Sequence, residues 1–427
     1  MHITTAFLSS GLLGLKKLFT VKQMKSTKAA IILSLSMMLS NCQGSVETGL
    51  DRVGAYKEVF QGKRLGIITN HTAYDSNGKY IVDVLRDMTD VTISALFSPE
   101  HGLWGKEQAG EKLNSQIDPV YNLPVYSLYG QTRKPTTKML RDIDALVFDI
   151  QDIGARFYTY IYTMSLAMEA AAENGKDFVV LDRPNPINGY CVQGNILEPE
   201  LASFVGLYPT PVRHGMTAGE LATMFNDQGW LADGAKADLV VIPMKGWRRR
   251  MWYDHTGLNF IKPSPNMPDL KTAAIYPGLC LLEGTNVSEG RGTKRPFRQF
   301  GAPWIDSKRL AEQLNKLSLP GMHFEPVSFI PAGSKYQGRT CNGVRIIITE
   351  RDKLDPYYSG IRIVNEVYQM YPDNLQFKAG HFDHLCGTLK IRNAITNRAS
   401  LNSLRNKWQV ELESFQEIRV KYLIYPD

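Results

Sequence analysis

The sequences ALVFDI at residues 145–150, YTYIYTMSLAMEAAAENG at residues 158–175 and FVVLD at residues 178–182 follow one another along the chain. The first and third are short apolar runs typical of buried strands, and the second has the length and composition of a helix. Strand, helix and strand in this order form the repeating unit of α/β domains that contain a parallel sheet. This stretch therefore decides the fold class.

The same alternation continues on both sides of this unit. Further strands are expected at 64–69, 91–97 and 238–243, and further helices at 80–86 and 218–227. Because such strands are buried on both faces, we expect a Rossmann-like, doubly wound, mostly parallel sheet in a catalytic domain over residues 52–270. The sequence has neither a G-x-G-x-x-G after a strand nor a Walker A lysine loop, so a dinucleotide-dependent oxidoreductase is disfavoured and no cofactor is predicted.

The regular alternation of strand-like and helix-like stretches ends near residue 271. A long polar loop at 284–300 precedes expected helices near 307–317 and 357–371 and expected strands near 324–330 and 343–349. These elements predict a smaller C-terminal α+β auxiliary domain over residues 271–427.

The N-terminal residues have the features of an export signal. Lys25 and Lys28 precede an apolar run at 29–39, which is too short to span a membrane. The run leads into Asn41 and Cys42, and the sequence LSNC resembles a bacterial lipobox, although Asn41 replaces the usual small residue. In a lipobox the cysteine is lipidated and becomes the new N-terminus.

We therefore predict a lipoprotein signal over residues 1–41, with Met24 as a plausible start, and a tether over residues 42–51. An ordinary cleaved signal is the alternative. Lipidation at Cys42 would attach the exported protein to the periplasmic face of a bacterial membrane, and Gln43 is compatible with the outer membrane.

The charge distribution disfavours a nucleic-acid partner. The formal net charge is +7, but five of the 49 basic residues and none of the 42 acidic residues lie within residues 1–41. The remaining chain is nearly neutral, so the basic excess belongs to the signal. Four cysteines remain after Cys42, without the spacing of a disulfide framework, and we expect them to be small buried side chains.

The motif SPEHG follows the strand at 91–97 and places Glu100 beside His101. Proline stops the strand and glycine permits a sharp turn, which leaves a carboxylic acid and an imidazole at the edge of the sheet. Both are candidate catalytic residues, and the alternative is a plain turn with a solvated glutamate.

Two more motifs follow predicted strands, where open α/β sheets place their ligands. The first, DIQDIGARFYTY at 149–160, offers two acids, of which one is expected to be structural. The second, DRPNPING at 182–189, is a loop made rigid by prolines. The candidates from both are Asp149, Asp152, Arg156, Tyr158, Asp182, Arg183 and Asn185.

RHGMTAGE at 213–220 and EGTNVSEGRGT at 283–293 complete the set. In the first, Glu220 can instead close a capping box with Thr217. The second combines glycines with neutral hydrogen-bonding side chains, as in sugar recognition. The candidates are Arg213, His214, Glu220, Asn286, Glu289 and Arg291. His381 and His384 are spaced i, i+3 without a third ligand, so no metal site is predicted.

Taken together and in this order, the five motifs closely resemble those of the exo-acting β-N-acetylmuramidase family of glycoside hydrolases over roughly residues 48–427. The resemblance implies release of N-acetylmuramic acid from the non-reducing end of peptidoglycan fragments, in a cleft between a Rossmann-like domain and an auxiliary domain. It singles out Glu100 as the leading catalytic carboxylate. The implied partner is a peptidoglycan-derived sugar or muropeptide.

Our working mechanism has Glu100, oriented by His101, protonating the leaving oxygen. Asp149, Asp152 or Glu289 would be the second, negatively charged carboxylate of the reaction, unless the substrate's acetamide acts as the nucleophile. The lactyl carboxylate that distinguishes muramic acid should meet an arginine, with Arg156, Arg183, Arg213 and Arg291 as candidates. The competing classes are a non-catalytic muropeptide-binding lipoprotein and a cell-wall amidase or esterase, the latter disfavoured by the lack of an evident nucleophile–base pair.

Overall fold

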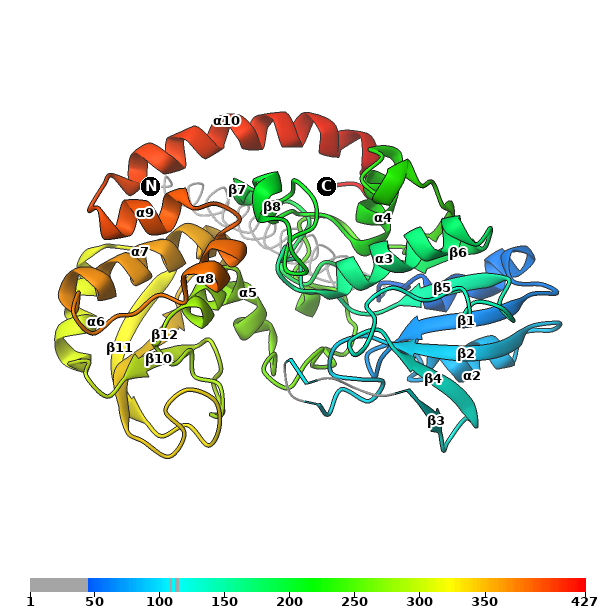
Figure 1. Ribbon diagram of the computed structural model, residues 1–427, viewed down its shortest axis with the longest axis horizontal. Helices are drawn as coiled ribbons and strands as arrows, with labels where there is room; N and C mark the ends of the chain where they lie inside the picture. Colours follow the sequence, from blue (N-terminus) through cyan, green and yellow to red (C-terminus); the bar gives the residue numbers. More distant parts are fainter. Residues whose placement is uncertain (1–44, 108–109, 112–114) are drawn as a thin grey trace, which may run out of the picture. The chain divides into compact units, whose positions relative to one another are not determined.

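A computed structural model describes residues 45–107, 110–111 and 115–427, and the signal, Cys42 and Gln43 lie outside these residues. Residues 46–427 contain a seven-stranded sheet in the order β3-β4-β2-β1-β5-β6-β9 (Figure 1). All neighbours in it are parallel except β3 and β4. The strands are β1 (Arg64–Thr69), β2 (Thr92–Ser98), β3 (Gln116–Asp118), β4 (Leu123–Ser127), β5 (Ala145–Asp149), β6 (Asp177–Leu181) and β9 (Asp238–Ile242).

Alternate side chains of the central strands enter two different apolar cores. Leu146 and Phe148 of β5 pack on the face covered by α3 (Tyr160–Glu173) and α4 (Ala218–Asp227). Ala145 and Val147 pack on the opposite face, with α2 (Ile81–Arg86) and the 3₁₀ segment η1 (Leu50–Val59). Burial on both faces explains why these strands are almost continuously apolar. The predicted doubly wound sheet is confirmed.

The second sheet is antiparallel and smaller, with the order β10-β12-β11. Its strands are β10 (Gln299–Ala302), β11 (Met322–Phe329) and β12 (Cys341–Ile348), and its predicted helices are α6 (Ser307–Lys316) and α7 (Pro356–Met370). The predicted α+β part is confirmed. The sequence reading did not include the short strands β3, β4, β7 (Gln193–Ile196), β8 (Pro211–Arg213) and β10, or the helices α5 (Leu270–Leu279), α8 (Ala379–Cys386), α9 (Lys390–Thr396) and α10 (Leu401–Arg419).

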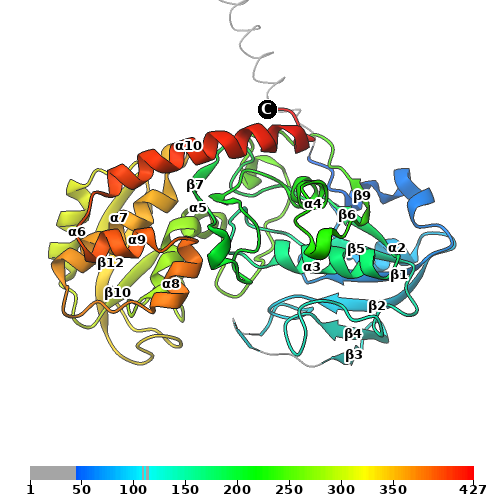
Figure 2. The same ribbon diagram turned by 45° about the horizontal axis from the view of Figure 1, so that its top comes forward.

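The 19-residue helix α10 leads the chain back to the first sheet. Figures 1 and 2 show it running from beside α9 toward α4. Beyond it, the backbone N–H of Ile424 donates to Glu220 and the hydroxyl of Tyr425 donates to Asp182. The last residues of the chain therefore complete the first domain.

The predicted tether differs from the structure in its second half. Val46 is buried against Met244, Trp247 and Tyr425. The backbone of Glu47 forms an antiparallel bridge with Lys245, with N–O distances of 3.0 and 2.9 Å. Residues 46–51 thus belong to the folded part of the chain, because their apolar side chains have a core to enter. Among the described residues, no helix is long and apolar enough to cross a membrane.

Candidate active site

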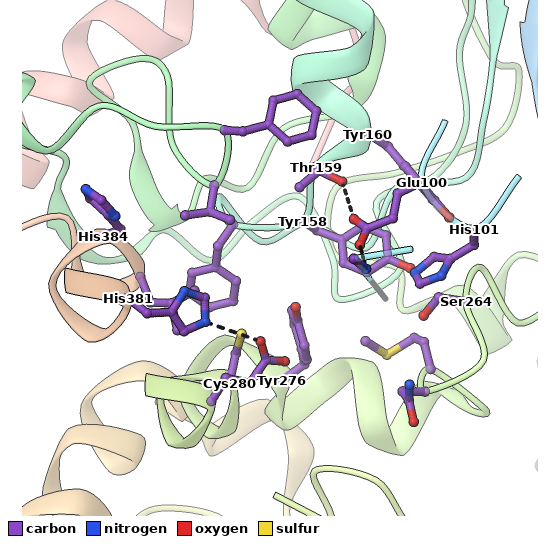
Figure 3. Close-up of a pocket in the computed structure, with 18 of the residues that line it drawn as sticks. Glu100, His101, Tyr158, Thr159, Tyr160, Ser264, Tyr276, Cys280, His381 and His384 are labelled. Atoms are coloured by element: carbon purple, nitrogen blue, oxygen red, sulfur yellow. Dashed lines mark hydrogen bonds and ion pairs between the residues drawn. The ribbon is translucent and has the colours of Figure 1, made fainter. Parts of the chain in front are cut away.

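A pocket of about 470 Å³ lies between the carboxyl ends of β2 and β5 and the helices α5 and α8 (Figure 3). Glu100, His101 and Thr159 line one side, and His381 and His384 line the other. Its wall also includes Tyr129, Arg133, Phe157, Tyr158, Tyr160, Phe204, Ser264, Asn266, Met267, Tyr276, Cys280, Glu283, Arg291 and Phe297.

Glu100 is held by two hydrogen bonds. Its Oε1 accepts from the backbone N–H of Gly110 at 3.1 Å, and its Oε2 accepts from the hydroxyl of Thr159 at 3.0 Å. His101 adopts a left-handed backbone conformation, with φ of 69°, and its Nδ1 lies 2.8 Å from the carbonyl oxygen of Glu107. His101 therefore lines the pocket beside Glu100, and the hydrogen bonds described for Glu100 come from Gly110 and Thr159, so its orientation by His101 stays a prediction.

A second carboxylate, Glu283, lines the pocket near α8. It pairs with Arg291 at 2.6 Å and with His381 at 3.7 Å. Burial alone would raise the pKa of Glu283, but the charges of Arg291 and His381 outweigh it and hold the pKa at about 2. Glu283 is therefore ionised, and its charge is balanced by its neighbours.

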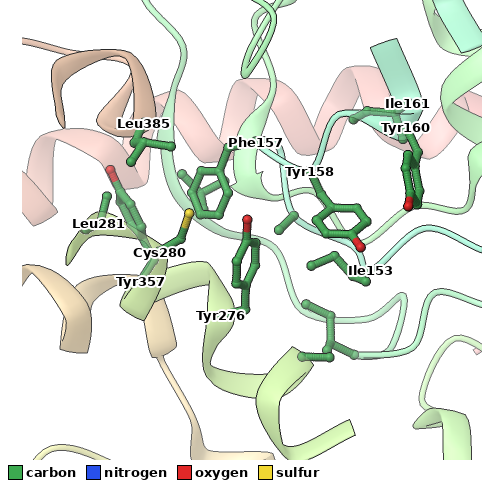
Figure 4. Packing of buried hydrophobic residues seen from close by; sticks show 14 of the residues in the cluster. Ile153, Phe157, Tyr158, Tyr160, Ile161, Tyr276, Cys280, Leu281, Tyr357 and Leu385 are labelled. Atoms are coloured by element: carbon green, nitrogen blue, oxygen red, sulfur yellow. The ribbon is translucent and has the colours of Figure 1, made fainter. Parts of the chain in front are cut away.

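Several aromatic residues that line the pocket also pack against one another (Figure 4). The ring of Tyr276, on α5, stands between Phe157 and Tyr158, which follow β5, at centroid distances of 5.4 and 5.9 Å. Phe297 contacts the Tyr276 ring at 4.8 Å. This cluster joins the first domain to α5 and gives that part of the pocket wall an aromatic character. Cys280 packs beside it, where burial raises the pKa of the thiol.

Asp149 and Arg183 form a buried ion pair below the pocket. Arg183 donates to both carboxylate oxygens of Asp149, at 2.9 Å for its Nη2, and also to the carbonyl of Tyr74 at 3.1 Å. Burial raises the pKa of Asp149, while Arg183 opposes that shift. The pair closes the ends of β5 and β6 and does not line the pocket.

The other predicted residues outside the pocket also hold the backbone together. Asp182 accepts from Thr217 and Gly219, and Glu220 closes the capping box and pairs with Arg249. The remaining side chains all bond to backbone groups or to a lysine: Arg156 to four carbonyls, Arg213 to the carbonyl of Ile187, Asn185 to Met216, Asn286 to Asn374, and Glu289 to Lys335.

Asp152 and His214 are buried next to each other, with 4.0 Å between the carboxylate and Nε2. Burial raises the pKa of Asp152 to about 7, although the backbone N–H groups of Gly154 and Ile153 act in the opposite direction. Burial also lowers the pKa of His214 to about 3. Neither residue lines the pocket.

Of the predicted site residues, the structure brings together Glu100, His101, Tyr158 and Arg291 in the pocket. Sequence reasoning missed Tyr129, Arg133 and Phe204, which lie in loops without a motif. It quoted Glu283 as the start of a motif and weighed His381 and His384 only as metal ligands. Within the described residues, no group of three or more His, Cys, Asp or Glu side chains could hold a metal ion.

A pocket of this volume, with a hydrogen-bonded glutamate and several aromatic residues in its wall, has the groups that glycoside hydrolases use. The particular family follows from comparison with known proteins. The chain belongs to the exo-β-N-acetylmuramidase NamZ family, because the models of its N-terminal and C-terminal parts match residues 65–271 and 274–425. The resemblance inferred from the five motifs is confirmed.

The relatives cover almost the whole chain. The peptidoglycan β-N-acetylmuramidase NamZ of Bacillus subtilis is 50% identical over 382 residues, which are 89% of this chain and 91% of that protein. Two crystal structures of DUF1343 family proteins from Bacteroides fragilis share the fold. The first has a TM-score of 0.83 and 39% identity, covering 89% of this chain and 99% of its own. The second has a TM-score of 0.75 and 32% identity, covering 90% and 100%.

The raised pKa of Asp152 predicts a pH-dependent loss of stability. An aspartate in the unfolded chain ionises near pH 4, whereas in the fold it stays protonated to about pH 7. Its stabilising contribution is therefore present below pH 4 and is lost as the pH rises to about 7. We expect Asp152→Asn to gain a few kcal/mol of unfolding free energy relative to wild type between pH 4 and pH 8.

Urea unfolding of wild type and Asp152→Asn at both pH values measures this difference. Asp373→Asn, at an exposed position, is the control and should follow wild type. If the free energy of unfolding changes equally between the two pH values for Asp152→Asn and for the control, Asp152 ionises normally in the folded protein.

Proposed function

We propose that this enzyme hydrolyses the β-glycosidic bond of N-acetylmuramic acid at the non-reducing end of peptidoglycan fragments, in cell-wall turnover. The observation that carries the proposal is Glu100, held by Gly110 and Thr159 at the wall of the pocket. Its support from relatives is the B. subtilis peptidoglycan β-N-acetylmuramidase, which matches nine-tenths of the chain at 50% identity.

In this proposal Glu100 is the general acid that protonates the leaving oxygen. The hydroxyl of Thr159 and the N–H of Gly110 fix the direction of its carboxyl group, as proton transfer requires. Tyr129 lines the same pocket, and burial and the charge of Glu100 raise the pKa of Tyr129 to about 12. Tyr129 stays protonated at neutral pH and can donate to the substrate or to Glu100.

Besides the acid, the reaction needs a group that attacks the anomeric carbon, and we propose that this nucleophile is the acetamide of the substrate. Asp149 and Asp152 lie outside the pocket, and Glu283 is already balanced by Arg291 and His381. A balanced carboxylate offers little net charge to an oxocarbenium-like transition state. The acetamide of N-acetylmuramic acid can attack the anomeric carbon internally, which needs only one protein acid. Glu283 is then left to bind sugar hydroxyls.

Replacing Glu100 tests the role of the acid. We expect Glu100→Gln to keep both hydrogen-bonding partners but to lower kcat on a chromogenic β-N-acetylmuramide by about 10²- to 10⁴-fold. The measurement is steady-state release of the chromophore, with the matching β-N-acetylglucosaminide as the comparison substrate. Unchanged turnover in the variant would remove Glu100 from the mechanism, and inactive folded wild type would refute the proposed reaction.

The anomer of the sugar that forms first tests whether the acetamide takes part or water attacks directly. Participation of the acetamide gives two inversions, so the product should appear as the β anomer before it equilibrates. Proton NMR during the first minutes of hydrolysis distinguishes the two anomers. Initial release of the α anomer would mean direct attack by water and would contradict the acetamide route.

We further propose that the enzyme is a lipoprotein exported to the periplasmic face of a bacterial membrane, the outer membrane in view of Gln43. The support is the sequence alone: basic residues, a short apolar run and the LSNC motif ending at Cys42. The folded part begins within a few residues of Cys42, since Val46 is already buried. Such a short connection would hold the enzyme close to the membrane surface.

The substitution Cys42→Ser in the full-length chain tests the lipid anchor. We expect wild type in the membrane fraction with incorporated radiolabelled palmitate, and Cys42→Ser without label. Cys191→Ser, at a cysteine of the folded domain, is the matched control and should remain labelled. Label retained in Cys42→Ser would contradict lipidation at this residue.

A further inference from the structure

We infer that Arg133, placed over the rings of Tyr129 and Phe204, forms the carboxylate-binding site of the pocket and takes the lactyl carboxylate of N-acetylmuramic acid. This inference rests on the proposed function, since it names the residue that recognises the muramic acid side chain. It differs from the four arginines that the sequence motifs offered.

Those four arginines have other partners. Arg156 and Arg213 are buried and donate to backbone carbonyls, and Arg183 is paired with Asp149. Arg291 reaches the pocket but lies between Glu283 at 2.6 Å and Glu289 at 3.3 Å. A guanidinium already bound to two carboxylates has few donors left for a third.

Arg133 is in the opposite situation. Of the two arginines lining the pocket in the described part of the chain, only Arg133 makes no ion pair with a carboxylate. Its guanidinium carbon lies 4.1 Å from the ring centroid of Phe204 and 5.9 Å from that of Tyr129. Neither ring contact pairs the guanidinium with a carboxylate, so among the described residues its N–H groups have no anionic partner and can bind one.

The loop on either side of Arg133 is fixed. The hydroxyl of Thr132 donates to the carbonyl of Lys134 at 2.6 Å and accepts from its N–H at 3.1 Å. The ammonium of Lys134 then pairs with Glu169 and Glu173 of α3, at 3.3 and 2.6 Å. Arg133 is thus held between two anchored residues, which lowers the entropy lost when its side chain binds a ligand.

The position also suits the geometry of the substrate. Glu100, Tyr129 and Arg133 all line the same pocket, and the guanidinium carbon of Arg133 lies 5.9 Å from the ring centroid of Tyr129. The site for the acid and the site for the carboxylate are therefore neighbours in one pocket. In N-acetylmuramic acid the lactyl group stands on carbon 3 of the ring whose carbon 1 reacts. N-acetylglucosamine has a neutral hydroxyl at carbon 3 and would leave Arg133 without an anion.

Isothermal titration calorimetry with N-acetylmuramic acid and N-acetylglucosamine tests the site without requiring turnover. We expect wild type to bind N-acetylmuramic acid more tightly, and Arg133→Ala to weaken that binding by about 10- to 100-fold while binding of N-acetylglucosamine is unchanged. Arg133→Lys keeps the charge but loses the bidentate contact, so its affinity for N-acetylmuramic acid should lie between those of wild type and Arg133→Ala. Lys138→Ala removes the same charge from an exposed position outside the pocket and should match wild type.

Hydrolysis of the chromogenic muramide completes the test. Arg133→Ala should raise KM for this substrate. When the lactyl carboxylate of the substrate is converted to its methyl ester, wild type and variant should have equal KM. A variant that still prefers N-acetylmuramic acid as strongly as wild type would overturn the inference, as would equal losses for both sugars. Binding that discriminates between the sugars in a wild type without turnover would refute the proposed reaction and leave the carboxylate site standing.

Discussion

The ion pair between Asp149 and Arg183 is the contact on which the active-site edge of the sheet depends. It joins the ends of β5 and β6, and the same arginine also bonds to the carbonyl of Tyr74 beyond β1. Breaking a buried pair by removing one partner costs about 3–5 kcal/mol, because the other charge is left without compensation. The segment that carries Phe157, Tyr158 and Thr159 into the pocket starts from this fixed point. Charged residues at the strand ends thus serve first to hold the loops and only in part to contact the substrate.

This explains how much of the protein could be predicted from its sequence. The central strands were found because burial on both faces makes them apolar, and β1 and α4 match their expected ranges. Short strands such as β3 and β8 carry too few residues to show a period. The long helix α10 has a mostly polar surface, with only five buried side chains, and its pattern is correspondingly weak.

The site was predicted only in part, for a different reason. The rule that ligands bind at the carboxyl ends of parallel strands located the edge, and the family resemblance singled out Glu100 there. It could not tell which side chains at that edge point into the pocket and which point down between the strands, as Asp149 does. Nor could it join Arg133 and His381, which are far apart in sequence and meet only through folding. Tyr276 packing between Phe157 and Tyr158 brings those distant parts together.

The return of the chain after α10 has a consequence for biogenesis. Asp182 and Glu220 are buried in the first domain, yet Tyr425 and the backbone of Ile424 supply part of their hydrogen bonding. Ile424 follows Glu220 by 204 residues and Tyr425 follows Asp182 by 243 residues, so these hydrogen bonds can form only after α10 has been synthesised. A chain that ends before Ile424 keeps the hydrogen bonds of Asp182 to Thr217 and Gly219 and the ion pair of Glu220, but it buries both acids with fewer hydrogen bonds. The stability of the first sheet is thus coupled to the segment that follows the second sheet, although the two sheets are built from separate stretches of the chain.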